Sequence, residues 1–222
     1  MLRHRRQFPP VDPARGARIA QAYLSIPVLD TGMACADAYR AFVADTVRLY
    51  RAVRARFTVI HTATDPYPNS AELFRALRET GTLRVFLGGS PHPLLSVPLG
   101  GEFGTLTAND LFRAVHDMAH FDLGAGFGPA GEDAVYRYHR DCEYRPESVP
   151  ALCTETRGQN SVFNFGPNPG NFADQKGAIL PYWCQWSDRP EDDRAPSPEH
   201  VIAMDRHAER GVGAEPLPVA RG

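Results

Sequence analysis

Apolar residues recur at helical spacing through the first quarter of the chain, over residues 13–56. Between residues 39 and 53, aromatic and aliphatic side chains return every three or four positions, with arginines on the other side, as in a helix that buries one face. Runs of β-branched and apolar residues at 57–62 and 83–87 indicate two short strands, and the stretch between them is predicted to be a helix ended by Gly81. Further helical segments follow. This order predicts an α+β fold that is predominantly helical with a small β-sheet.

The length and composition of the chain favour one folded domain. Of its 222 residues, 43% are hydrophobic and 23% are charged, which supplies enough apolar surface for a core and excludes disorder of the whole chain. We expect a single domain over residues 1–187. A loosely attached polar tail over residues 188–222 is expected to follow, with one short helix at residues 198–210.

Charge, hydropathy and cysteine content limit the partners and the compartment. The 24 basic and 26 acidic side chains leave a net charge of -2, which argues against a nucleic acid held by electrostatic attraction. No apolar run approaches the roughly 20 residues of a membrane span. The four cysteines are far apart, and the basic N-terminus precedes no apolar signal segment, so we expect reduced thiols in a cytoplasmic protein. The expected partner is a small molecule, and a homo-oligomer is left open.

Two of the eight histidines have the spacing of metal ligands. His116 and His120 are four residues apart, so on a helix they differ by about 40° around the axis and leave from the same face. Residues 107–110 resemble a capping box that would start this helix. Its other residues are mostly apolar, which predicts burial, and Asp117 is placed to support a neighbouring ligand. Such a histidine pair can hold one metal ion, as in H-E-x-x-H enzymes.

A third ligand is expected from a later helical segment at about residues 148–159. Glu155 lies there next to apolar residues, and a buried carboxylate needs a partner. A cation held by His116 and His120 is one such partner, and Arg157 is the competing one. In the second case the histidines are structural and the chain is a non-catalytic binding module.

Another predicted helix, at residues 132–140, carries further polar groups. Glu132 and His139 share one of its faces, and we expect them to support the site or to contact substrate. The alternative is a second metal ion held by Glu132, His139 and Glu155, which would form a dinuclear iron site.

The reaction depends on the metal that two histidines and one carboxylate would hold. Iron(II) in such a triad can bind O2 and substrate side by side, as in non-haem oxygenases. Zinc with the same ligands activates a water for hydrolysis, with Asp117 or Glu132 as the general base. The base in H-E-x-x-H hydrolases is a glutamate, and Asp117 is one methylene shorter, which favours iron.

The runs at residues 109–120 and 153–158 resemble the iron core of the pterin-dependent aromatic amino acid hydroxylases. Those enzymes carry a His-Glu-x-x-Gly-His helix, followed by a Thr-x-Glu-Phe-Gly segment that supplies the third ligand. The resemblance covers residues 107–160. This chain departs from the pattern in its closer histidine spacing, in an aspartate after the first histidine and in having no recognisable pterin-binding segment. The iron ligands that the resemblance implies are His116, His120 and Glu155.

A second resemblance is to an uncharacterised domain of phage and mobile-element polyvalent proteins. Runs like those at residues 109–117, 154–161 and 172–176 recur together in that domain, which implies that their polar residues share a site with the histidines. An arginine beside amide side chains suits a substrate carboxylate or amide. The expected substrate contacts are Arg157, which would anchor a carboxylate, and Gln159 and Asn160.

Together these features predict a mononuclear non-haem iron(II) oxygenase that uses O2 on a small amino-acid-like or aromatic substrate. The alternatives are a zinc hydrolase with the same ligands and a dinuclear iron oxygenase. The residues expected to support the chemistry around the metal are Asp117, Glu132 and His139.

Overall fold

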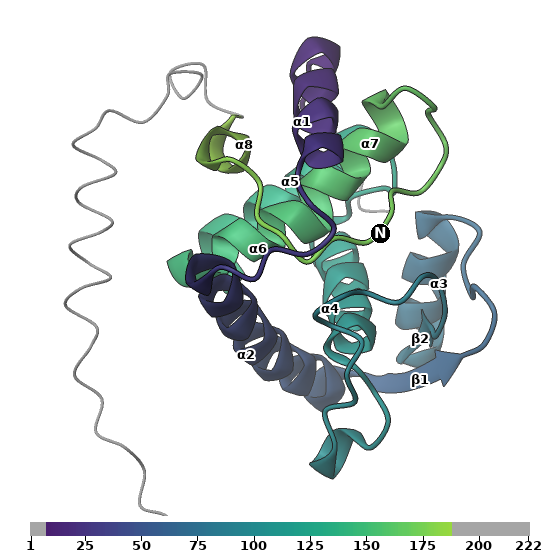
Figure 1. Cartoon of the computed structure of the whole chain (residues 1–222). Coiled ribbons are helices and arrows are strands. Elements are labelled where there is room, and N and C mark those ends of the chain that lie inside the picture. The colour runs from purple at the N-terminus through teal and green to yellow at the C-terminus, as the bar shows by residue number, and fades with distance from the viewer. Residues whose placement is uncertain (1–7, 188–222) are drawn as a thin grey trace, which may run out of the picture.

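The computed structural model describes residues 8–187, a helical body with a two-stranded sheet at one side (Figure 1). The predicted α+β class, predominantly helical with a small β-sheet, is confirmed. The tail at residues 188–222, with its predicted helix at 198–210, lies outside the described residues. None of the described helices has the length and apolar character needed to cross a bilayer.

In chain order the elements are α1 (Pro13–Ser25), α2 (Met33–Arg56), β1 (Thr58–Thr62), α3 (Ser70–Thr80), β2 (Thr82–Phe86), a 3-10 turn (Gly101–Phe103), α4 (Ala108–Leu123), α5 (Pro129–Tyr138), a π-helical turn (His139–Glu143), a 3-10 turn (Pro146–Ser148), α6 (Val149–Cys153), a second π-helical turn (Thr154–Gly158), α7 (Gln159–Phe165) and α8 (Tyr182–Trp186).

The helical stretch predicted over residues 13–56 consists of two helices, α1 and α2. The chain leaves α1 at Ile26, whose backbone is extended, because a proline disfavours the helical conformation at the residue before it and Pro27 follows. α2 begins after Gly32. The break allows α1 to pack on α7, while α2 packs on α4.

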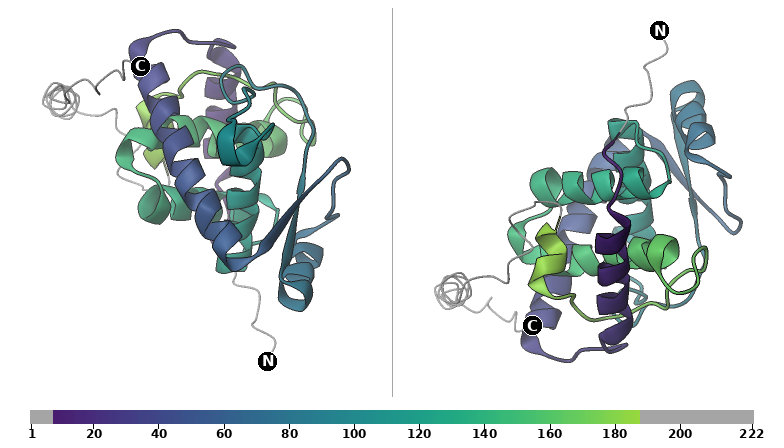
Figure 2. Two further views of the ribbon diagram at one scale, coloured as in Figure 1. Left: turned by 90° about the horizontal axis from the view of Figure 1, so that it is seen from below. Right: turned by 90° about the horizontal axis from the view of Figure 1, so that it is seen from above.

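The sheet is a single parallel pair at the edge of the helical body. Residues 58–62 of β1 lie opposite residues 82–86 of β2, and α3 connects them as the crossover that parallel strands require. The Asn69 side chain caps the start of α3, and Gly81 ends it in the left-handed conformation. Both α3 and α4 contact β2, so the sheet stands beside the helices and is not enclosed by them (Figure 2).

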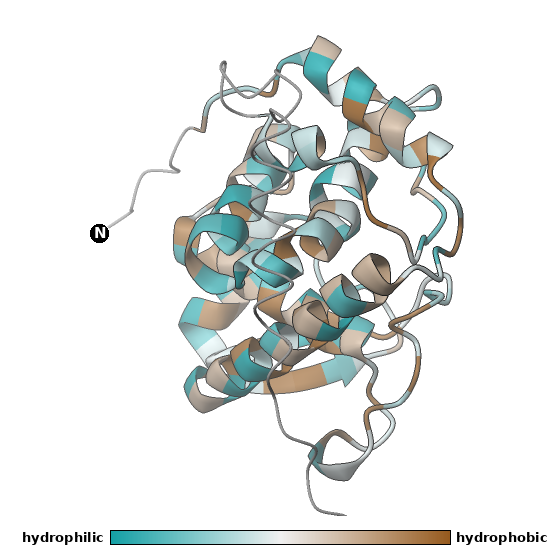
Figure 3. Cartoon of the chain, turned by 60° about the vertical axis from the view of Figure 1, so that its left-hand side comes forward, coloured by the Kyte–Doolittle hydropathy of each residue, from teal (hydrophilic) through white to brown (hydrophobic). Residues whose placement is uncertain are grey.

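α4 carries the histidine pair and runs through the middle of the molecule (Figure 1). The Thr107 hydroxyl accepts a hydrogen bond from the Asp110 backbone N–H, and the Asp110 carboxylate accepts one from the Thr107 N–H. The predicted capping box is therefore present. The helix packs against α2, α5 and β2. Hydrophobic and hydrophilic residues alternate around the helices, as expected for elements that share one core (Figure 3).

The helical segment predicted at residues 148–159 is longer and less regular than expected. α6, the π-helical turn Thr154–Gly158 and α7 follow one another directly, and the other π-helical turn continues α5. A π-helical turn holds more residues than an α-helical turn, so it changes the direction in which later side chains point. α7 ends at Phe165, beyond residue 159, where the predicted segment ends.

Candidate metal centre

Three side chains from α4 and α5 converge in the interior. The Nε2 atoms of His116 and His120 are 3.2 Å apart. Glu132 Oε2 lies 3.1 Å from His116 Nε2, and Glu132 Oε1 lies 3.4 Å from His120 Nε2. Within residues 8–187, these three residues form the one group of His, Cys, Asp or Glu side chains whose ligand atoms are close enough to share a metal ion.

The distances between these atoms fit a shared ion. Two ligand atoms that are each about 2.1 Å from an ion, and about 90 to 110° apart around it, lie about 3.0 to 3.4 Å from each other. The Nε2–Nε2 separation of 3.2 Å falls within that range, as do the 3.1 and 3.4 Å separations from the two Glu132 oxygens, each of which faces one histidine. Tetrahedral and octahedral coordination are both compatible with them.

Glu132, the third residue of the group, reaches the histidines because the link between α4 and α5 is short and tight. Gly124 ends α4 in the left-handed conformation, and α5 begins at Pro129. Gly131 packs so closely on this link that an added Cβ would overlap the Gly126 carbonyl oxygen. Glu132 lies in the first turn of α5, where the helix dipole favours an ionised carboxylate.

His120 is oriented by the backbone of the same link. Its Nδ1 lies 3.1 Å from the Ala125 carbonyl oxygen. A carbonyl can only accept, so Nδ1 carries the proton and Nε2 is the atom left to face the group. Metal-ligating histidines are commonly held by such a bond. The side chain is fully buried.

His139, expected to support the site, lies next to His116 but outside the three-residue group. The two ring centroids are 5.5 Å apart, and His139 Nδ1 is 2.5 Å from Glu143 Oε2. The predicted dinuclear set of Glu132, His139 and Glu155 is therefore not brought together, because His139 is directed to Glu143 by the π-helical turn on which both lie.

The protonation of the three groups is coupled. Burial lowers the pKa of His116 to about 4, against the attraction of Glu132. Burial alone would also lower the pKa of His120 and raise that of Glu132. Their mutual attraction and hydrogen bonds outweigh it, so the pKa of His120 is raised above 6.5 and that of Glu132 is held below 4.5. The group therefore combines an anionic carboxylate with a histidine, His120, that holds its proton more tightly than a free imidazole does.

The three residues open onto a cavity of about 600 Å³, a size typical of small-molecule sites. Asp117 also lines it, and burial raises the pKa of this carboxyl to about 7. The aromatic residues of the wall are Tyr67, Phe86, Phe112, Phe127, Phe163 and Phe172.

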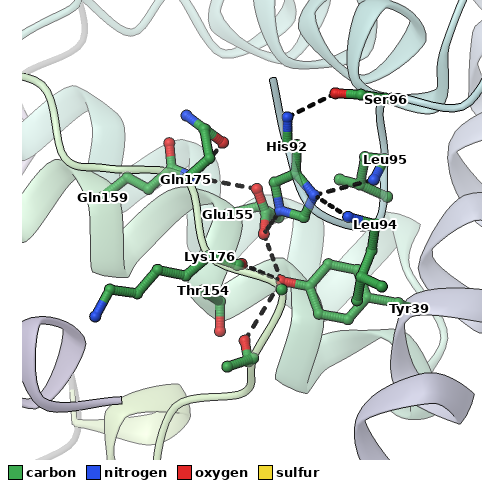
Figure 4. Close-up of polar contacts among 12 residues, drawn as sticks. Tyr39, His92, Leu94, Leu95, Ser96, Thr154, Glu155, Gln159, Gln175 and Lys176 are labelled. Carbon is green, nitrogen blue, oxygen red and sulfur yellow. Dashed lines mark hydrogen bonds and ion pairs between the residues drawn. The ribbon is translucent and has the colours of Figure 1, made fainter. Parts of the chain in front are cut away.

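Glu155 lines the same cavity but does not join the histidine pair, contrary to the sequence expectation. Its Oε1 is 2.5 Å from the Tyr39 hydroxyl and 2.9 Å from His92 Nε2, and its Oε2 is 3.0 Å from Gln159 Nε2 (Figure 4). The third member of the candidate metal group is thus Glu132, which the sequence had suggested as a supporting residue. Glu132 occupies the position expected for Glu155 because the short α4–α5 link places its carboxylate next to both histidines.

Arg157, expected to anchor a substrate carboxylate, is directed away from the cavity. Its guanidinium lies 2.8 Å from Asp133 Oδ1, bonds the Cys184 and Gln185 carbonyls and stacks on the Tyr136 ring. It is 3% exposed and does not line the cavity. A buried guanidinium needs an anion, and Asp133 supplies it.

Gln159 and Asn160, the other expected substrate contacts, do line the cavity. Gln159 bonds Glu155, and Asn160 Nδ2 donates to Glu132 Oε2 at 3.0 Å. Neighbouring residues at the start of α7 thus connect Glu155 with the candidate metal group. Tyr39 and His92 were missed as site residues because no spacing in the sequence relates them to residue 155.

Comparison of the chain with protein-family models, curated proteins and solved structures gave no match. The site is therefore interpreted from its own geometry.

Proposed function

We propose that this chain is a mononuclear metal enzyme in which His116, His120 and Glu132 hold an iron(II) ion and a small molecule is oxidised with O2. The observation that carries the proposal is the convergence of two Nε2 atoms and one carboxylate at 3.1 to 3.4 Å. The bond from His120 to the Ala125 carbonyl supports it, because it aims Nε2 at the same point.

The surroundings of the group favour an oxygenase. Three ligands on one side of iron(II) leave coordination positions free for O2 and substrate. The aromatic side chains of the cavity wall suit an apolar substrate body. No group in this proposal requires a pterin.

A zinc hydrolase with the same ligands is the second candidate, and the position of Asp117 favours it. This residue directly follows His116, as the general base of H-E-x-x-H hydrolases follows their first histidine, and it lines the cavity. Zinc would supply an activated water, and Asp117 would accept its proton.

Metal analysis of protein purified without added metal tests the site. We expect about one iron per chain in the unmodified protein, the amount that a single triad holds. Glu132→Gln should weaken metal binding by more than about 100-fold, the upper end for loss of an outer partner. Glu155→Gln should retain the metal. The matched control is Glu102→Gln, because Glu102 is exposed and does not line the cavity.

Nitric oxide, which binds free positions on iron(II), distinguishes the two reactions. The oxygenase predicts a paramagnetic nitrosyl signal in the iron-loaded protein, together with O2 consumption. Zinc as the sole bound metal, with no response to oxygen, would favour the hydrolase. Retention of metal by Glu132→Gln and its loss in Glu155→Gln would contradict the assignment of the third ligand.

We also propose a cytoplasmic location. The four cysteines all lie among the described residues and are free thiols, three of them buried, which suits a reducing compartment.

A further inference from the structure

We propose that Glu155 is the binding point for a protonated amine, so that the substrate of this cavity is a small amine with an apolar or aromatic body. The proposal deepens the function given above and rests on it for the reaction. The binding of the amine does not depend on the metal.

The Glu155 carboxylate is buried among neutral donors. The Tyr39 hydroxyl and the Gln159 amide donate to it. His92 Nδ1 accepts the backbone N–H groups of Leu94 and Leu95, so the proton of this ring is on Nε2, which donates to Glu155 as well. These donors stabilise the negative charge without neutralising it.

No arginine or lysine of the described residues pairs with this carboxylate, whose one histidine partner, His92, donates through Nε2. Arg157, two residues after Glu155, pairs with Asp133, and the Lys176 ammonium bonds the carbonyl oxygens of Tyr23, Leu24 and Ile26. Figure 4 shows the Lys176 side chain extending away from Glu155. The Glu155 side chain is 2% exposed, and burying a carboxylate without an arginine or lysine partner lowers the stability of the fold. That cost indicates that the carboxylate is kept for a function.

The free acceptor capacity of Glu155 is on the oxygen nearer the cavity amides. A carboxylate accepts about four hydrogen bonds. Oε1 takes two, from Tyr39 and His92, and Oε2 takes one, from Gln159. Gln159 also donates to Gln175 Oε1, and Glu155, Gln159 and Gln175 all line the cavity. Two of the three donors of an ammonium group can bond the remaining Oε2 position and the Gln175 carbonyl oxygen.

The other charges of the cavity also favour a cation. Asp65 and Asp117 are further acidic residues of its lining, and among the described lining residues Arg113 is the one permanently cationic side chain. Arg113 donates a hydrogen bond to the Phe86 carbonyl oxygen and is attracted by the Asp117 carboxylate. The Phe163 and Phe172 rings, 5.0 Å apart, line the same cavity and suit an apolar body or a cation–π contact.

The experiment is a binding titration of the full chain with three probes of matched shape. These are 2-phenylethylamine, its neutral analogue 2-phenylethanol and the anion phenylacetate. We expect the amine to bind at least about tenfold more tightly than the alcohol, a difference of about 1.4 kcal/mol, in metal-free and metal-loaded protein alike. Equal affinities, or no amine binding at millimolar concentration, would overturn the proposal.

Substitutions at Glu155 and Gln175 test which residues cause the preference for the amine over the alcohol. Glu155→Gln should abolish the preference for amine over alcohol, with circular dichroism as the check on folding. Since Glu155 is buried and its replacement could impair folding, a pair of variants at Gln175 tests the site with Glu155 left intact. Gln175→Lys should block the amine by placing an ammonium beside Glu155, and Gln175→Met should not. If Gln175→Lys leaves amine binding unchanged, the proposal fails.

The metal and the amine can be tested separately. Glu132→Gln should lose metal and keep the preference for the amine. Failure of the unmodified protein to bind iron or zinc, with the preference intact, would remove the proposed function alone. Metal binding without any preference for the amine over the alcohol would contradict the proposed amine site and leave the proposed metal enzyme standing.

Discussion

His120 is the residue at which proton and metal compete. Its pKa is raised above 6.5 in the metal-free protein, whereas that of His116 is lowered to about 4. A proton on His120 must leave before Nε2 can bind a metal. We therefore expect metal affinity to fall as the pH drops through the raised pKa of His120, and metal binding near neutral pH to release a proton.

Calorimetry in two buffers with different heats of ionisation measures that proton directly. His116 is neutral until the pH approaches 4, so it should not contribute near neutral pH. A metal affinity that stays constant between about pH 8 and pH 5 would contradict the competition at His120.

The choice between two glutamates marks the limit of sequence reasoning at this scale. The histidine pair could be predicted, because four-residue spacing on a helix is a local property. Glu132 and Glu155 were both recognised as candidates, and each in fact lines the cavity. Which of them faces the histidines depends on the path of the backbone at residues 124–131, and no side-chain pattern in the sequence encodes that path.

At the scale of elements, the contact between α5 and its preceding link decides whether Glu132 is in range. Because a Cβ at Gly131 would overlap the Gly126 carbonyl oxygen, Gly131→Ala must shift the start of α5. We expect the variant to weaken metal binding by about 10- to 100-fold, comparable to the loss of a supporting contact. Titration with zinc or iron(II) measures it.

Gly128→Ala is the matched control, since the same addition at Gly128 meets no atom within 4 Å and its φ is negative. Equal metal affinities of the two variants would show that the close packing of Gly131 does not position Glu132.

The elements differ in how far the sequence predicts them. α3, α4 and both strands follow from local signals, namely capping residues, terminal glycines and β-branched runs. The π-helical turns have no such signal, because they arise where packing on neighbouring helices favours a wider turn. Side-chain directions beyond residues 139 and 154, including that of Arg157, were therefore beyond prediction.

At the scale of the whole molecule, Asp133 joins segments that are distant in sequence. It pairs with Arg157 and with Arg15 of α1, and Arg157 in turn bonds the backbone at residues 184–185. Asp133→Ala would leave the Arg157 guanidinium buried without this partner. We expect a loss of about 3 to 5 kcal/mol in the free energy of unfolding, measured by urea titration.

Asp37→Ala is the control for that loss. The Asp37–Arg40 pair is solvent-exposed, with 61% and 74% of its side chains accessible, so removing it should cost about 0 to 1 kcal/mol. A similar cost for both variants would mean that Asp133 does not stabilise the interior.

The π-helical turn at Thr154–Gly158 has an evolutionary consequence. Each residue added to or removed from a helix rotates everything after it by about 100°. Glu155 lies inside this turn, and Asn160 lies just beyond it, bonded to Glu132. Deleting one of residues 156–158 would regularise the helix and turn Gln159 away from Glu155 as well as Asn160 away from Glu132. A change of a single residue in length would thus alter both ends of the cavity at once.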